Sequence, residues 1–126
     1  MANIQNKIKI LHVDDEADTL TVVKKILENE GYEVVSVSSG GTALGNIKLN
    51  GFSLIILDIM MPDMSGWELF TKIGLIRPDY KVIFLSILEL PPEKRKELFD
   101  AGVKDYIQKP FDRTDLVNRV KKAISF

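Results

Sequence analysis

The sequence predicts an α/β fold: a doubly wound, five-stranded parallel sheet between two layers of helices, in a (βα)5 arrangement. Short apolar runs rich in β-branched residues alternate with longer segments of helical period. Several runs are almost continuously apolar, which is typical of parallel strands covered on both faces. These units fill the chain and leave no linker or repeat, so we expect a single domain over residues 1–126.

The strands and the first two helices follow from the local sequence. Strands are predicted at 8–13, 33–37, 53–57, 81–85 and 105–107. The first helix is expected over 17–30, where apolar residues recur at helical spacing and Gly31 supplies a stop. The second is expected over about 42–49, with Gly51 after it. Strands that alternate with helices in this way give βαβ units.

The last three helices carry clear boundary signals. Ser65 opens a capping-box pattern, and the helix that it starts should end before Pro78, which disfavours helix in the preceding residue. A fourth helix is expected to start near Pro91, since proline is accepted in a first turn, and to stop at Gly102. Asp112 should cap a fifth helix that runs to the C-terminus.

Composition and charge narrow the classes of function. The formal net charge of −1 gives no bulk attraction to nucleic acid or to an anionic membrane. The chain has no cysteine and one histidine, which argues against thiol chemistry, catalytic triads and zinc-type sites. That histidine, His12, lies within the first strand, where we expect a core residue with satisfied hydrogen bonds. No apolar run could span a bilayer, so we expect a cytoplasmic protein that binds neither membrane nor nucleic acid directly.

Polar side chains follow the apolar strands at the points where the strands end. Asp14 and Asp15 follow the first strand, Asp58 the third and Ser86 the fourth, and Lys109 comes shortly after the fifth. The carboxyl ends of parallel strands meet at one edge of the sheet, where open α/β sheets bind their ligands. We therefore expect three carboxylates, a hydroxyl and an amine to converge there.

This set of groups suits phosphoryl chemistry. Crowded carboxylates repel one another unless they share a cation, and Mg²⁺ prefers oxygen ligands and accepts phosphate oxygen. Asp14, Asp15 and Asp58, with a backbone carbonyl just after Asp58, could hold it. Lys109 and Ser86 add partners for a transferring phosphoryl group. Asp58 is the best candidate nucleophile because its strand lies centrally in the expected order 2-1-3-4-5. Each residue alone fits a cap or a loop, so the interpretation depends on the whole set.

Longer motifs surround these residues and resemble the receiver domain of two-component response regulators. The matching segments are 13–16, 57–66, 84–86, 101–106 and 109–111. The resemblance extends over residues 8–124 and implies a flavodoxin-like, three-layer fold. It also implies that Asp58 is the phosphoacceptor. Asp14 and Asp15 would be the acidic pair that holds Mg²⁺, together with Asp58 and the carbonyl of Met60.

The resemblance further implies a switch and a set of partners. Ser86 would be the hydroxyl that turns toward the phosphoryl group, Lys109 would pair with that group, and Tyr106 would swing inward with Ser86. The bond from Lys109 to Pro110 would be cis. The donor would be a histidine kinase or a histidine phosphotransfer protein. A downstream protein partner, or a second copy in a homodimer, would bind the face formed by the fourth helix, fifth strand and fifth helix.

Two departures from the family pattern and two alternative functions accompany this interpretation. Ile87 follows Ser86 where the family usually has a small residue, and the stretch from Ser86 to Lys109 is one residue longer than usual. One alternative is a receiver-like module that binds partners without phosphorylation. The other is an aspartyl-phosphate hydrolase of the haloacid dehalogenase type, which would need an aspartate where Met60 stands.

Overall fold

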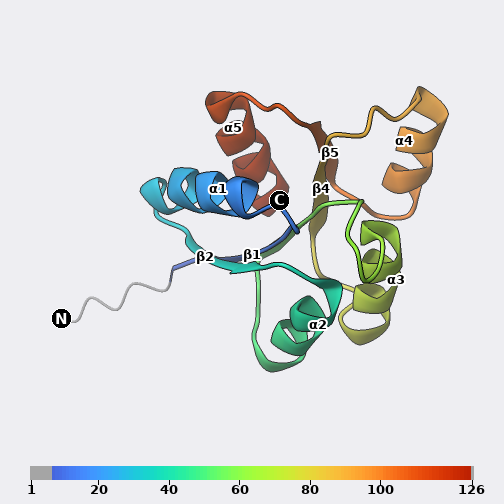
Figure 1. Ribbon diagram of the computed structural model, residues 1–126, viewed down its shortest axis with the longest axis horizontal. Helices are drawn as coiled ribbons and strands as arrows, with labels where there is room; N and C mark the ends of the chain where they lie inside the picture. The colour runs from blue at the N-terminus through green and yellow to red at the C-terminus, as the bar shows by residue number, and fades with distance from the viewer. Residues whose placement is uncertain (1–6, 126) are drawn as a thin grey trace.

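The computed structural model describes residues 7–125, and its elements alternate between strand and helix throughout (Figure 1). The strands are β1 (Lys9–Val13), β2 (Glu33–Val37), β3 (Leu54–Leu57), β4 (Val82–Ser86) and β5 (Asp105–Gln108). The helices are α1 (Ala17–Asn29), α2 (Gly40–Leu49), α3 (Gly66–Ile76), α4 (Pro92–Asp100) and α5 (Arg113–Ile124). Residues 1–6 and 126 of the expected domain lie outside the described residues.

The strands form one parallel sheet in the order β2-β1-β3-β4-β5, which confirms the predicted topology. Helices α1 and α5 cover one face, and α2, α3 and α4 cover the other (Figure 1). The side chains of β3 are buried on both faces, which explains its unbroken apolar sequence. Two apolar clusters result, one under each helical layer.

Most predicted boundaries agree with the structure to within one residue. Ser65 and Asp112 cap α3 and α5 as predicted, because their side-chain oxygens accept backbone N–H groups of the first turn. The prediction placed the start of α2 two residues late: the helix begins at Gly40. Ser39 caps it by accepting the N–H of Thr42 at 3.2 Å, which offsets the low helix propensity of the glycines. No helix within residues 7–125 is long and apolar enough to cross a bilayer.

Candidate functional site

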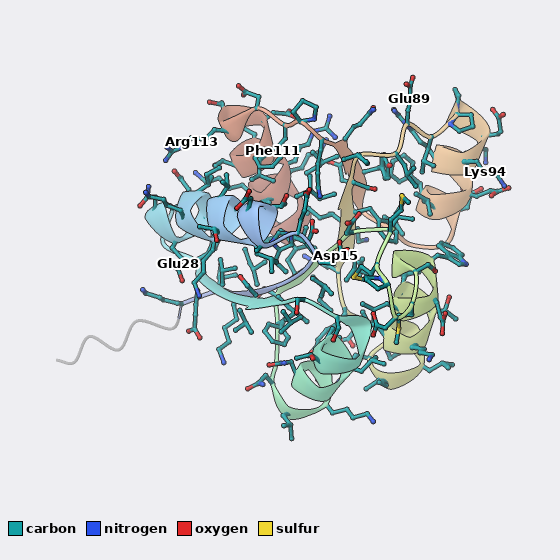
Figure 2. The ribbon with its side chains drawn as sticks, in the orientation of Figure 1. Asp15, Glu28, Glu89, Lys94, Phe111 and Arg113 are labelled. Atoms are coloured by element: carbon teal, nitrogen blue, oxygen red, sulfur yellow. The ribbon has the colours of Figure 1, made fainter. Side chains whose placement is uncertain are left out.

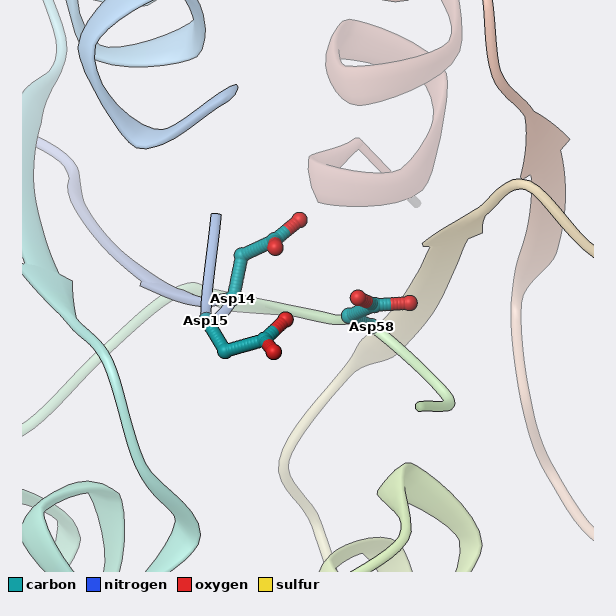
Figure 3. A group of neighbouring side chains, drawn as sticks. All are labelled: Asp14, Asp15 and Asp58. Atoms are coloured by element: carbon teal, nitrogen blue, oxygen red, sulfur yellow. The ribbon is translucent and has the colours of Figure 1, made fainter. Parts of the chain in front are cut away.

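The carboxyl ends of β1 and β3 bring three carboxylates together (Figure 3). Asp14 and Asp15 directly follow β1, and Asp58 directly follows β3. One oxygen from each lies within 4.8 Å of the others. Asp14 and Asp58 are buried, and Asp15 is exposed. The structure thus gathers the predicted acidic residues on an edge that is open to solvent at Asp15.

Lys109 reaches this cluster from the segment after β5. Its Nζ lies 2.8 Å from Asp14 Oδ2, 3.4 Å from Glu16 Oε1 and 4.0 Å from Asp58 Oδ2. Burial disfavours the charge of Lys109, but the hydrogen bond to Asp14 and the surrounding carboxylates outweigh it and raise its pKa. The peptide bond to Pro110 is cis, as the resemblance implied. Lys109 therefore stays charged and neutralises part of the cluster.

The Asp58 carboxylate is held at higher energy than an exposed one. Burial and the negative charge of Asp14 raise its pKa above the ordinary 3.8. Lys109, the N–H of Met60 and the Ser86 hydroxyl act in the opposite direction without cancelling this effect. A further positive charge near Asp58 would therefore be strongly favoured.

The donor set fits a hard divalent cation. Asp14, Asp15 and Asp58 offer only oxygen atoms, and one ammonium group, that of Lys109, faces these three carboxylates. The carbonyl of Met60 belongs to the loop after β3, and the Met60 N–H approaches Asp58 Oδ1 at 3.4 Å. The structure brings together the three carboxylates that the sequence predicted as Mg²⁺ ligands, and the ligand role of these residues and of Met60 stays a prediction.

Ser86 and Tyr106 form a connected pair beside the cluster. Ser86 is fully buried at the end of β4, and its Oγ accepts the N–H of Leu88 at 3.3 Å. Tyr106 is buried on β5, and its hydroxyl donates to the carbonyl of Leu88. The guanidinium of Arg95 lies 5.8 Å from the centre of the Tyr106 ring. Leu88 therefore contacts both side chains: its N–H donates to Ser86 and its carbonyl accepts from Tyr106, while the switch role of this pair stays a prediction.

Asp63 makes a long-range contact that sequence reasoning missed. Its carboxylate accepts the backbone N–H groups of Gly40 and Gly41 at 3.2 and 3.1 Å, across 23 and 22 positions of sequence. These contacts lower its pKa, and they attach the loop after β3 to the first turn of α2. A carboxylate facing two adjacent glycines gives no local signal, because only the fold brings the two segments together.

The expectation for His12 was half wrong. The side chain is buried in the core as predicted, but neither ring nitrogen has a hydrogen-bond partner among residues 7–125. The sequence could not show this, because the groups that face a strand residue come from neighbouring strands and helices.

An apolar groove of about 470 Å³ adjoins the acidic cluster. Its lining includes Val22, Ile87, Phe111 and Lys109. Ile87 is 64% exposed, so its side chain lies at the rim of the site rather than in the core.

Figure 2 shows Asp15 between the helical layers and Phe111 beside α5, whereas Glu89 and Lys94 lie at the periphery around α4.

Comparison with known proteins identifies the family. The family model of the response regulator receiver domain matches residues 10–121, so the chain belongs to that family. Transcriptional regulatory protein PcoR of Escherichia coli is 35% identical over 116 residues, which are 92% of this chain and 51% of PcoR. The chain spans about half the length of the first curated relatives that it matches.

Solved structures agree with this family. A CheY-like receiver domain protein from Methanospirillum hungatei JF-1 is 36% identical and has a TM-score of 0.86, with 94% of each chain covered. Response regulator TrrA from Thermotoga maritima, in complex with Mg²⁺ and BeF, is 34% identical with a TM-score of 0.81, over 92% of this chain and 98% of that one. The fold is thus CheY-like, and the chain is a receiver domain of the kind used as signalling modules in two-component systems.

Proposed function

We propose that this receiver accepts a phosphoryl group on Asp58, with Mg²⁺ bound by Asp14, Asp15, Asp58 and the Met60 carbonyl. The observation that carries the proposal is the cluster of three carboxylates at the carboxyl ends of β1 and β3, with the Lys109 Nζ 4.0 Å from Asp58 Oδ2. The complex of TrrA with Mg²⁺ and BeF supports the same assignment in a relative.

The residues divide the work of transfer. An Asp58 oxygen attacks the phosphorus of a phosphohistidine, so that an O–P bond forms, the N–P bond breaks and the released imidazole takes up a proton. When bound, Mg²⁺ supplies positive charge that offsets the charge of the transferring group. Lys109, 4.0 Å from Asp58 Oδ2, turns to a phosphoryl oxygen, and the Ser86 hydroxyl donates to another.

The donor would be a histidine kinase or a histidine phosphotransfer protein. The apolar groove beside the site gives such a donor a surface to dock on, because Val22 and Ile87 are both exposed at its edge. Docking there would bring a phosphohistidine close to Asp58.

The response would appear on the face formed by α4, β5 and α5. Movement of Ser86 toward the phosphoryl group would alter its contact with Leu88, and Leu88 also holds the Tyr106 hydroxyl. On the same face Arg119 pairs with Asp105 at 2.8 Å and with Asp115 at 3.0 Å. A downstream protein or a second copy of the chain would bind this surface.

Location and other partners remain predictions. We expect a cytoplasmic protein whose described part does not bind nucleic acid itself. Relatives such as PcoR are transcriptional regulators about twice the length of this chain, so nucleic-acid binding by a longer protein is compatible with the family.

Phosphotransfer tests the proposal directly. Acetyl phosphate with Mg²⁺ should label the wild-type protein, and Asp58→Asn should abolish the label. Asp79→Asn, at an exposed carboxylate outside the site, is the matched control and should leave labelling unchanged. Label retained in Asp58→Asn would refute the assignment of the acceptor. Failure of the wild type to respond to Mg²⁺ with beryllofluoride would favour a receiver-like module that acts without phosphorylation.

A further inference from the structure

Three buried polar atoms on β1 and β2 have no hydrogen-bond partner within the part of the chain that the structure describes. They are Nδ1 and Nε2 of His12 and Oγ of Ser36. His12 is fully buried, and a buried polar atom left without a hydrogen bond lowers the stability of the fold. Two neighbouring residues with such atoms therefore call for a structural or functional explanation.

His12 and Ser36 face the same helical layer. They are partners in the parallel register of β1 and β2, and side chains alternate along each strand. Two positions earlier, Ile10 and Val34 are also partners, and both belong to the apolar cluster beneath α1 and α5. The imidazole and the Ser36 hydroxyl thus occupy neighbouring positions within one buried layer.

The imidazole also faces Asp14. Its Nε2 lies 4.0 Å from Asp14 Oδ2, the oxygen that accepts the Lys109 ammonium at 2.8 Å. The other oxygen, Oδ1, accepts the N–H of Glu16 at 2.9 Å. A neutral imidazole carries one donor and one acceptor, so each nitrogen of this fully buried ring needs a partner of the opposite kind.

We propose that His12 is a positioning residue for Asp14: Nε2–H is directed at Asp14 Oδ2, and Nδ1 accepts the hydroxyl hydrogen of Ser36. This arrangement would give all three atoms a partner. It needs Nε2 to move about 1 Å closer to Asp14 Oδ2, and the Ser36 hydroxyl to come within hydrogen-bond distance of Nδ1.

The role deepens the proposed function and rests on it. When Lys109 turns to a phosphoryl oxygen, Asp14 Oδ2 loses its cationic partner. The Nε2–H of His12 then keeps the carboxylate oriented toward the metal. Groups that orient metal ligands in this way typically change metal affinity about 10–100-fold when they are removed.

The tautomer of His12 is the first test, and it needs neither metal nor phosphate. Nitrogen-15 NMR of the unmodified protein should show the proton on Nε2, with Nδ1 as the acceptor. Ser36→Ala should shift the Nδ1 resonance while the proton stays on Nε2. A proton on Nδ1, or a charged ring at pH 7, would overturn the proposal.

Paired substitutions provide the second test. His12→Leu should bind Mg²⁺ with beryllofluoride about 10-fold more weakly than wild type, because it fills the space without a donor. His12→Gln has both a donor and an acceptor and should recover most of the affinity. Circular dichroism checks that both variants fold.

The two tests separate this inference from the proposed function. Wild-type affinity in His12→Leu, or equal losses in folded Leu and Gln variants, would overturn the positioning role while Asp58 still accepted phosphate. If the wild type itself bound no beryllofluoride, the proposed function would fail, and the tautomer measurement would still report on the contact between His12 and Asp14.

Discussion

At the scale of single residues, Gly66 shows how closely the start of α3 approaches Asp58. A Cβ atom at this position would collide with the carbonyl oxygen of Asp58 and lie 2.9 Å from the Ile59 Cα. The glycine is therefore required by close approach, and the N–H of Gly66 donates to the Ile59 carbonyl at 2.7 Å. The backbone at Asp58 and Ile59 is therefore packed directly against the start of α3.

Gly66→Ala should destabilise the protein by about 1–3 kcal/mol, because the new methyl group must displace the Asp58 backbone. Urea unfolding measures this loss, and phosphorylation of Asp58 should slow in parallel. Gly74→Ala is the matched control in the same helix: no atom lies within 4 Å of the added Cβ, so it should stabilise by up to about 1 kcal/mol. Equal effects of the two substitutions would contradict the packing argument.

Ile87 gives a second prediction at this scale. Its exposed side chain lines the groove beside Lys109, whose Nζ lies 4.0 Å from Asp58 Oδ2, and we expect it to narrow the access of water and small donors to that carboxylate. Ile87→Ala should therefore speed both phosphorylation by acetyl phosphate and spontaneous loss of the phosphoryl group several-fold. Val22→Ala, on the α1 side of the same groove, should leave the spontaneous loss unchanged. Unaltered rates in Ile87→Ala would show that this side chain does not limit access.

At the scale of elements, the contact between Asp63 and the first turn of α2 depends on charge. Gly41 and Gly40 lower the Asp63 pKa below 3.8, so the stabilisation is complete above that value and is lost as pH falls through the lower, folded pKa. Asp63→Asn should therefore be less stable than wild type at pH 6, and the difference should shrink toward pH 3. Asp79→Asn, an exposed carboxylate without a hydrogen bond in the described residues, is the control. A pH-independent difference would contradict the charge argument.

Helix α4 is attached to the molecule much more weakly than α5. Its sequence is mostly charged, and Leu98 is its one buried side chain, whereas α5 buries Leu116, Val117, Val120 and Ala123. Fewer buried apolar groups mean a lower free energy of local opening. Hydrogen exchange should therefore be faster in α4 than in α5, and binding of beryllofluoride should alter α4 more. Equal protection of the two helices from exchange would show that α4 does not open more easily than α5.

The same scale shows what the sequence could and could not predict. Apolar runs, caps and glycine stops predicted every strand and helix because those signals are local. The start of α2 was misplaced because two glycines, which have low helix propensity, form its first positions after the Ser39 cap. The roles of Asp63 and His12 were missed because their partners come from other segments of the chain. Residues at strand ends were predicted correctly because parallel topology alone brings them to one edge.

At the scale of the whole molecule, the acidic cluster stores an electrostatic cost that Mg²⁺ should relieve. Because the pKa of Asp58 is raised in the fold, its contribution to stability is greatest at low pH and is lost as pH rises through the folded value. At pH 7 the ionised carboxylate therefore opposes folding. Asp58→Asn keeps the shape without the charge and should melt a few degrees above the metal-free wild type.

With Mg²⁺ bound, the wild type should melt at a higher temperature than Asp58→Asn. A ligand that binds only the folded state stabilises it by about 2.7 kcal/mol at 100 times its dissociation constant, so saturating Mg²⁺ should raise the wild-type melting temperature. Asp58→Asn, with a weaker site, should gain less, and EDTA should return both proteins to their metal-free values. Differential scanning calorimetry measures all four states. An equal gain in both proteins would place the metal away from Asp58, since the cation would then not be neutralising the charge that burial and Asp14 impose on that carboxylate.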